Sequence, residues 1–478
     1  MNSSIVIPFW IFILLCLLAA WAAIGSLLIP SVRWFLRRRV NRVIDELNTR
    51  LQLRIQPFKT TKRQVLIDRL LYDPEVLKAA EAFAHEHNIS RDEAMAKAER
   101  YAREIVPSFN AYAYFRAGYA IARWFARLLY RVRLGYSDEA GLSKVDKNSG
   151  VVFVMNHKSN MDYILVAYLA ATRSALSYAV GEWARIWPLQ TLIRTLGAYF
   201  IRRNSGGNLL YRRVLSRYVQ MATEGGVVQA VYPEGGLSRD GKIRPIKLGL
   251  LSYMVSGFNL DWERDLVFVP VGINYDRVIE DRSLLLKLDP SSKKKSFFYA
   301  ISTTLKFLFH NFGLMLRRRW YRYGYAGVNF GTPVSMREYM KKHNIDFRKM
   351  DENTRHITVE RLGNEIMAEV EKVIPVLPVS LVSTVLLQNG VTEMEEGKEF
   401  SELELKVAVQ RLVEKLEHLG AHVYIPRSDQ EYAIAVGLRM LTLRRLIIIE
   451  DGMYRANTKE VALLRYYANS IEHLFSKE

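Results

Sequence analysis

The sequence has almost no cysteine. Its single thiol, Cys16, lies within an apolar N-terminal run, so the chain can form no intramolecular disulfide and no cysteine-based zinc site. This scarcity fits a reducing compartment. Internal repeats and low-complexity tracts are also missing, which argues against solenoid and other repeat architectures.

Acidic residues are fewer than basic ones. The chain has 68 Lys and Arg against 49 Asp and Glu, a formal net charge of +19. This excess favours an anionic partner, which can be a nucleic acid, an anionic membrane surface or an acidic substrate. With 478 residues, 50% of them hydrophobic, the chain is long enough for two or more globular units.

Charge is absent from residues 5–29, an apolar stretch long enough to cross a bilayer as a helix. Basic residues follow it at once: Arg33, Arg37, Arg38, Arg39 and Arg42. By the positive-inside rule, this pattern predicts a single-pass transmembrane anchor over residues 1–30, with the rest of the chain on the cytoplasmic face of the cell (inner) membrane. A cleaved signal peptide is the alternative, but no basic segment precedes the apolar run.

The rest of the chain divides into three parts by its texture. A helical region, an α/β domain and a helical C-terminal region are expected at residues 31–140, 141–335 and 336–478. In the first part, Ser90 and Glu93 form a capping pattern, and another helix is expected around 110–133. The last part contains a strand-like segment at 444–456.

Within the second part, short apolar runs alternate with helical stretches. Strands are expected at 151–155, 176–180, 198–201, 227–232, 266–271 and 325–330. The alternation predicts an α/β fold with a mixed, largely parallel sheet flanked by helices, whose ligands bind at the strand ends. An insert at about 282–320 has basic flanks, and we expect either a membrane-facing amphipathic element or a buried helical hairpin there.

Chemistry enters after the first of these strands. His157 and Asp162 follow it with four residues between them, so a carboxylate can reach one imidazole nitrogen while the other accepts a proton from an alcohol. His87 and Asp92 have the same spacing. However, no strand precedes that second pair, and Asp92 falls in the first turn of an expected helix, where an acid is electrostatically favourable. Context therefore favours His157 and Asp162.

Two later strand ends carry cations and glycines. The first ends in the adjacent Arg202 and Arg203, whose planar guanidinium groups suit a phosphate. The second contains a candidate acceptor for substrate hydroxyls, two glycines that allow close backbone approach, and two candidate phosphate ligands: Glu234, Gly235, Gly236, Arg239 and Lys242. A fourth stretch, Val269 to Asp276, is a buried strand in which Pro270 and Gly272 can shape an apolar wall.

Together and in this order, the four stretches resemble the four motif blocks of the glycerolipid acyltransferase superfamily. Gly-x-x-Phe-Ile-Arg-Arg and Glu-Gly-Gly-x-Ser-Arg resemble the bacterial PlsB type of glycerol-3-phosphate acyltransferase more than the lysophosphatidate acyltransferases. Trp187-Pro188 and the run from Tyr466 to His473 also resemble the PlsB type. The resemblance covers about residues 110–478, and the N-terminal anchor is not carried over from it.

The resemblance implies an enzyme of the first step of phospholipid synthesis. A fatty acyl group is expected to pass from acyl-CoA or acyl carrier protein to the sn-1 hydroxyl of glycerol 3-phosphate, with His157 as general base and Asp162 as its partner. The positions that the family uses near the acceptor are Arg202, Arg203, Glu234, Gly235, Ser238 and Arg239. Pro270 is the expected acyl-chain wall, and neither a metal nor an organic cofactor is implied.

One position departs from the family pattern. The third block usually has an arginine where this chain has Leu237. Phosphate binding is then expected from other cations of the same loop, or else the acceptor differs; the candidates are Arg239, Lys242 and Arg244. Donors for the tetrahedral oxyanion are expected from backbone N–H groups at the Gly235-Gly236 turn or at the helix start after His157.

Other functions fit parts of the sequence. The acceptor can be dihydroxyacetone phosphate or a lysophospholipid. A different class, a membrane-tethered basic protein that binds nucleic acid through its C-terminal region, fits the net charge. Against it, that region carries a run of acids, Glu393, Glu395, Glu396 and Glu399, and has no basic stripe with interleaved aromatics. An inactive scaffold with the same fold conflicts with the intact His157 and Asp162. Nucleic acid is therefore not an expected partner, whereas a lipid bilayer is.

Overall fold

The computed structural model describes residues 12–13, 55–111, 113–170, 175–181, 189–202, 207–288, 322–347, 349–388 and 397–475. The expected anchor at 5–29, apart from Phe12 and Ile13, and most of the expected insert at 282–320 lie outside these ranges. Within them, no helix has both the length and the apolar character that crossing a bilayer requires.

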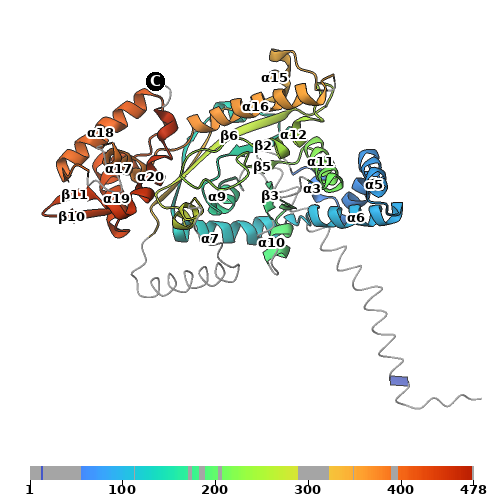
Figure 1. Cartoon of the computed structure of the whole chain (residues 1–478), viewed down its shortest axis with the longest axis horizontal. Helices are drawn as coiled ribbons and strands as arrows, with labels where there is room; N and C mark the ends of the chain where they lie inside the picture. The colour runs from blue at the N-terminus through green and yellow to red at the C-terminus, as the bar shows by residue number, and fades with distance from the viewer. Residues whose placement is uncertain are drawn as a thin grey trace, which may run out of the picture.

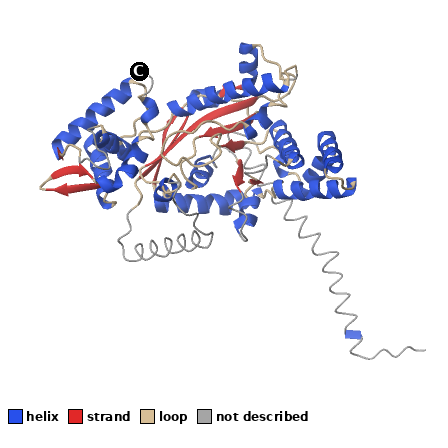
Figure 2. Ribbon diagram, in the orientation of Figure 1, coloured by secondary structure: helices blue, strands red, loops and turns tan. Residues whose placement is uncertain are grey.

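A mixed, largely parallel sheet forms the centre of the molecule (Figures 1 and 2). Its strand order is β1-β7-β6-β2-β5-β3-β4, with β8 beside β6. The bounds are β1 Arg131–Ser137, β2 Gly150–Met155, β3 Ser177–Gly181, β4 Tyr199–Ile201, β5 Gln229–Val231, β6 Leu266–Tyr275, β7 Tyr325–Phe330 and β8 Val334–Ser335. The β6–β7 and β6–β8 pairs are antiparallel and the other described pairs are parallel. The expected sheet type is confirmed.

Helices cover both faces of this sheet. One face packs against α4 Arg63–Leu71, α5 Pro74–Glu86, α6 Arg91–Ile105, α11 Leu209–Glu224, α12 Gly249–Val255, α15 Met336–His343 and α16 Glu352–Lys372. The other packs against α7 Tyr119–Leu129, α9 Met161–Ala170 and α13 Asp281–Leu285. Shorter helices connect these elements: α3 Pro57–Thr60, α8 Glu139–Lys144 and α10 Leu189–Thr195.

Residues of β2 alternate between the two cores. Val151, Phe153 and Met155 belong to the core with α9 and the C-terminal helices, whereas Val152 and Val154 belong to the core with α11 and α12. Because successive side chains of a strand point to opposite faces, a strand buried on both sides has to be apolar throughout. Burial on both faces therefore explains why β2 is apolar along its whole length.

The C-terminal region lies at one end of the molecule, opposite the helices α5 and α6 (Figure 1). It contains α17 Pro378–Leu387, α18 Glu402–His418, α19 Gln430–Leu443 and α20 Val461–Ala468, with a small sheet of β9 Phe400–Ser401, β10 Ile447–Glu450 and β11 Met453–Ala456. The strand-like segment predicted at 444–456 is the β10–β11 hairpin. Apolar side chains of α17, α19 and α20 belong to the same core cluster as β2, β6 and β7.

Strand β1 differs from the expectation of a helix around 110–133. Helix α7 ends at Leu129, and from Arg131 the chain runs parallel to β7. The run from Arg131 to Leu134 alternates basic and apolar residues with a period of two, which is typical of a strand, so the predicted helix extends past its true end at Leu129. This segment forms a strand by pairing with β7, which lies almost 200 residues later in the sequence and therefore outside any local pattern.

Candidate active site

The first predicted pair meets at the carboxyl end of β2. His157 Nδ1 lies 2.8 Å from Asp162 Oδ2, and both side chains are buried. Since a carboxylate only accepts hydrogen bonds, Nδ1 carries the proton and Nε2 is left as an acceptor. No other described residue forms a hydrogen bond with that second nitrogen. This tautomer is the one a general base requires.

Asp162 is held from several sides. Its Oδ2 also accepts the backbone N–H groups of Lys158, at 2.8 Å, and Ser159, at 3.0 Å. Its Oδ1 accepts the hydroxyl of Tyr275 at 2.6 Å, from the neighbouring strand β6. Burial, and then the charge of Asp162, raise the pKa of Tyr275, so this hydroxyl keeps its proton and donates. The carboxylate is therefore fixed in position before any substrate binds.

Aromatic rings fix the imidazole. Tyr232 stacks on His157 with 4.1 Å between ring centroids and 26° between planes. Tyr163 meets the imidazole edge-on at 5.5 Å. Only 5% of the His157 side chain is exposed to solvent. The imidazole ring is therefore held against Asp162 and is largely shielded from bulk water.

Glu234 joins the first motif to the third. Its Oε1 accepts the backbone N–H of His157 at 2.7 Å, and its Oε2 accepts that of Arg244 at 2.9 Å. Burial raises the pKa of Glu234. The expected role toward substrate hydroxyls stays a prediction, because each oxygen of the carboxylate already holds one backbone group. The loop is tied back a second time by Ser238, whose N–H donates to the carbonyl of His157 at 2.9 Å.

Lys158 is buried beside the His157–Asp162 pair and was not predicted as a site residue from the sequence. Its ammonium group donates to the carbonyl of Gly241, and burial lowers its pKa to about 8. Glu234, Asp240 and Asp162 oppose that shift by their charges. Lys158 therefore ties the turn after β2 to the far end of the loop at residues 232–242, the glycine loop.

Backbone donors around His157 fall into two groups. At the helix start, the N–H groups of residues 158–162 all have partners: Asp162 Oδ2 for 158 and 159, Glu280 for 160, and Ser159 for 161 and 162. In the glycine turn, Gly235 donates to Tyr232, whereas Gly236 and Leu237 donate no backbone hydrogen bond to another described residue. Of the two expected sources of oxyanion donors, the glycine turn is the one left available.

The predicted cations do not converge. Arg202 forms a two-pronged ion pair with Glu104 of α6 at 2.9 and 2.6 Å, and Lys242 pairs with Glu472 at 2.7 Å. Arg239 is exposed, and Arg203 lies outside the described residues, as do Trp187 and Pro188. The third candidate of this loop, Arg244, flanks the glycine turn together with Lys247, which was not predicted. Positions where a side chain of Gly235 or Gly236 would begin lie 2.6 Å from Lys247 Cδ and 3.3 Å from Arg244 Nη1, respectively.

Pro270 lies inside β6, opposite Val154 of β2. Its missing N–H falls between the segment of β6 that pairs with β8 and the segment that pairs with β7, where no antiparallel partner needs it. Its expected role as acyl-chain wall stays a prediction.

The second His–Asp pair does not form a site. His87 ends α5, its Nδ1 lies 3.1 Å from the carbonyl of Phe83, and its ring stacks on Phe83. Asp92 lies in the first turn of α6, behind the N-cap Ser90. No hydrogen bond or ion pair joins the two among the described contacts. Of the two pairs, the structure brings together the one that the sequence context favours.

Three functional neighbours were missed by sequence reasoning: Lys158, Tyr232 and Tyr275. Tyr232 and Tyr275 both lie within the motif stretches, but a tyrosine at a strand end is usually core. Their signal is positional. Tyr275 ends β6 and Tyr232 directly follows β5, and both strands pair with β2, so the two side chains can face the turn that carries His157.

Comparison with known proteins finds two family models that match this chain. A family model described as "Acyltransferase" matches residues 138–274, and one described as "Glycerol-3-phosphate acyltransferase C-terminal region" matches residues 311–478. Glycerol-3-phosphate acyltransferase of Pseudomonas fluorescens (strain Pf0-1) is 28% identical over 424 residues, 87% of this chain and 49% of that protein. The protein of the same name from Pseudomonas aeruginosa (strain LESB58) is 27% identical over 449 residues, 92% of this chain and 52% of that protein.

These matches confirm the resemblance that the four motifs predict. The chain spans about half the length of the curated relatives it matches. A solved structure, the 1-acyl-sn-glycerophosphate acyltransferase PlsC from Thermotoga maritima, aligns with a TM-score of 0.29 and 18% identity over 53% of this chain and 80% of that one.

Proposed function

We propose that this chain, a relative of the bacterial glycerol-3-phosphate acyltransferases of the PlsB type, transfers a fatty acyl group to the sn-1 hydroxyl of glycerol 3-phosphate. The donor is acyl-CoA or acyl carrier protein, and the product is lysophosphatidic acid. The observation that carries the proposal is the buried pair of His157 and Asp162, with Nδ1 protonated and Nε2 as the acceptor.

Transfer is direct, in a complex with both substrates. His157 Nε2 removes the hydroxyl proton while the oxygen attacks the thioester carbonyl. The tetrahedral intermediate then collapses, and the imidazolium returns the proton to the departing thiolate. A general base of this kind contributes about 10²–10⁴-fold, and placing both substrates contributes more. The reaction needs neither a metal nor an organic cofactor.

The backbone of the glycine turn supports the oxyanion in this scheme. The N–H groups of Gly236 and Leu237 have no other partner among the described residues. Gly235 adopts a φ of +65°, a left-handed conformation that a side chain disfavours, and this shapes the turn. The phosphate of the acceptor is held by Arg239, Arg244 and Lys247. These three cations replace the arginine that the family usually has at the position of Leu237.

The decisive experiment is thioester-dependent acylation of radiolabelled glycerol 3-phosphate by the full chain, with His157→Ala and the control His87→Ala. We expect wild type and His87→Ala to be equally active, and folded His157→Ala to lose activity by at least about 10²-fold. If wild type makes no lysophosphatidic acid with either donor type, the acceptor assignment is wrong. Dihydroxyacetone phosphate or a lysophospholipid is then tested in the same assay.

We also propose that residues 1–30 anchor the chain, with its catalytic domain on the cytoplasmic face of the cell (inner) membrane. The support is the charge-free run at 5–29 and the arginines behind it. An anchor would keep the site beside its water-insoluble product. Deleting residues 1–30 should move the chain from the membrane to the soluble fraction after a high-salt wash. Full retention on membranes would contradict a sole N-terminal anchor.

A further inference from the structure

The run from Tyr466 to His473 contacts the loop that follows β6 and the glycine loop, and none of its described contacts is with His157. The sequence singles this run out as part of the family resemblance, yet the proposed chemistry gives it no task. It begins in the last turn of α20, in the C-terminal region. Two separate sets of contacts connect it to the site, one through Asp281 and one through the glycine loop.

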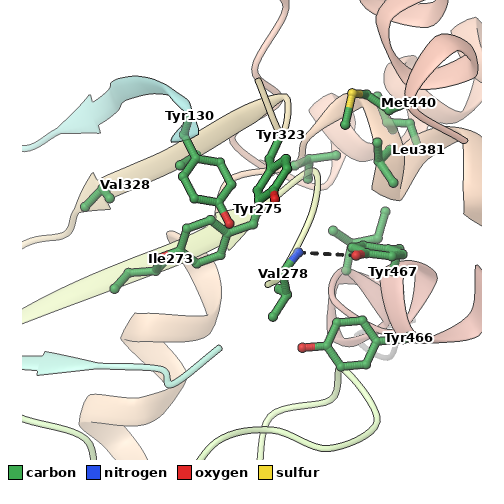
Figure 3. Packing of buried hydrophobic residues seen from close by; sticks show 14 of the residues in the cluster. Tyr130, Ile273, Tyr275, Val278, Tyr323, Val328, Leu381, Met440, Tyr466 and Tyr467 are labelled. Carbon is green, nitrogen blue, oxygen red and sulfur yellow. Dashed lines mark hydrogen bonds between the residues drawn. The ribbon is translucent and has the colours of Figure 1, made fainter. Parts of the chain in front are cut away.

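The first set centres on Tyr467. Its hydroxyl donates to Asp281 Oδ2 and accepts from Arg444 Nη1 at 2.6 Å and from the backbone N–H of Val278 at 3.2 Å. Arg444 Nη2 lies 2.5 Å from the same Asp281 oxygen. The side chains of Arg444 and Asp281 are only 8% and 5% exposed. Figure 3 shows the Tyr467 hydroxyl turned toward the Val278 N–H, in the segment that follows Tyr275.

Asp281 leads directly to the catalytic turn. The preceding residue, Glu280, accepts the hydroxyl of Ser159 at 2.7 Å. It also accepts the backbone and side-chain N–H groups of Asn160 at 3.2 and 3.0 Å. Both residues lie between His157 and Asp162. Whatever fixes the backbone at 280 and 281 therefore fixes the turn that sets the His157–Asp162 geometry.

The second set of contacts holds the glycine loop. Asn469 Nδ2 donates to the carbonyl of Asp240 at 2.9 Å. The backbone at Gly241 lies so close to Tyr466 that an added Cβ would be 1.9 Å from the Tyr466 carbonyl oxygen. On its other side, Gly241 accepts from Lys158. The end of the loop is thus enclosed between the C-terminal region and the catalytic turn.

We propose that Tyr467, with Arg444 and Asp281, is a positioning residue: this trio, the Tyr467 clamp, lets the C-terminal region complete the active site of the core domain. The inference rests on the proposed function. It assigns the C-terminal region a part in catalysis without any contact to substrate. The buried Asp281 carboxylate accepts hydrogen bonds from both a hydroxyl and a guanidinium group. Two such donors fix its position, whereas a single donor would leave it less well defined.

A matched pair of variants tests the clamp. Tyr466 and Tyr467 are adjacent and buried, at 2% and 1% exposure, but the Tyr466 hydroxyl has no hydrogen-bond partner among the described residues. Tyr467→Phe and Tyr466→Phe therefore remove the same atom, and only the first removes clamp contacts. Figure 3 shows the two rings near each other on α20. Arg444→Lys keeps the charge but loses the fork that reaches both partners.

We expect folded Tyr467→Phe to show a kcat lower by about 10- to 100-fold, because small misplacements of a base have effects of this size, with the KM for glycerol 3-phosphate changed much less. Arg444→Lys should fall between it and wild type, and Tyr466→Phe should match wild type. Hydrogen exchange of the amides of residues 157–162 should accelerate in Tyr467→Phe and stay at the wild-type rate in Tyr466→Phe. A purely structural role would lower thermal stability and leave kcat per folded molecule unchanged.

An unchanged kcat in folded Tyr467→Phe, or exchange at 157–162 equal to that of Tyr466→Phe, overturns the clamp. If wild type fails to acylate glycerol 3-phosphate, the proposed function fails instead. In that case the exchange comparison still decides whether Tyr467 holds the turn.

Discussion

At the scale of single residues, Glu234 has the most demanding surroundings. Its carboxylate is buried, with one oxygen on the N–H of His157 and the other on that of Arg244. The two carboxylate oxygens thus accept hydrogen bonds from the two backbone N–H donors. An amide would meet them with one acceptor and one donor, so one buried N–H would face another.

We therefore expect Glu234→Gln to lower the free energy of unfolding by about 1–3 kcal/mol, the usual cost of an unsatisfied buried group, and to lower acylation as well. Chemical denaturation and the acylation assay measure the two effects. Glu224→Gln, at an exposed position at the end of α11, is the control and should change neither. Wild-type stability and activity in Glu234→Gln would show that the two backbone bonds do not matter.

Residue identity predicted the reacting groups but not their attachments. The spacing of His157 and Asp162 and the strand before them were enough to select the pair, because turn and helix geometry are local. The hydroxyl of Tyr275 on Asp162 was not foreseen, since its residue is 113 positions away in sequence. Likewise, Arg202 was expected at phosphate and instead pairs with Glu104, whose proximity depends on how α6 packs.

At the scale of elements, the glycine loop and α20 form the tightest junction. Gly241 has a φ of +88° and no room for a side chain against Tyr466. Gly452, in the β10–β11 turn, has a φ of +78°, and a Cβ added there would meet nothing within 4 Å. The two positions share the backbone conformation and differ only in the space around them.

Replacing each glycine by alanine separates the two effects. Gly452→Ala should cost only the left-handed backbone, about 1–2 kcal/mol. Gly241→Ala should cost about 1–3 kcal/mol more, because a backbone segment must move, and it should also reduce acylation by shifting the loop. Equal losses of stability, measured by chemical denaturation, would mean that α20 does not press on the loop.

The elements themselves followed well from local patterns. Expected strands at 151–155, 176–180 and 325–330 correspond to β2, β3 and β7, since apolar runs with turn residues around them have few other solutions. The boundary between α7 and β1 did not follow, because basic and apolar residues continue across it and the pairing partner β7 is distant in the sequence.

At the scale of the whole molecule, Asp276 joins the sheet to the C-terminal region. Its fully buried carboxylate accepts the N–H of Tyr325 in β7 at 2.8 Å and that of Val379 in α17 at 3.0 Å. Burial raises the pKa of Asp276 to about 7. In an unfolded chain an aspartate has a pKa of about 3.9, so between these values the folded state binds the extra proton.

Folding stability from this group is therefore fully present below about pH 4 and lost as pH rises through about 7. We expect the melting temperature of wild type to fall between pH 5 and 8, and Asp276→Asn to fall less over the same range. Asp351→Asn is the control: that exposed carboxyl caps α16, its hydrogen bond from Thr354 lowers its pKa, and its contribution changes only at lower pH. Parallel curves for wild type and Asp276→Asn would contradict the assignment.

Short-range spacing and periodicity were enough to predict the sheet type, the strands β2 to β7, the His157–Asp162 pair and the family resemblance. Packing settled the rest: which N–H groups stay available for an oxyanion, which cations are already paired, and that Tyr467 and Arg444 reach Asp281. The last two contacts join segments more than 150 residues apart. Contacts of this kind depend on how helices and sheet pack around a shared core, and no local pattern in the amino-acid sequence records that.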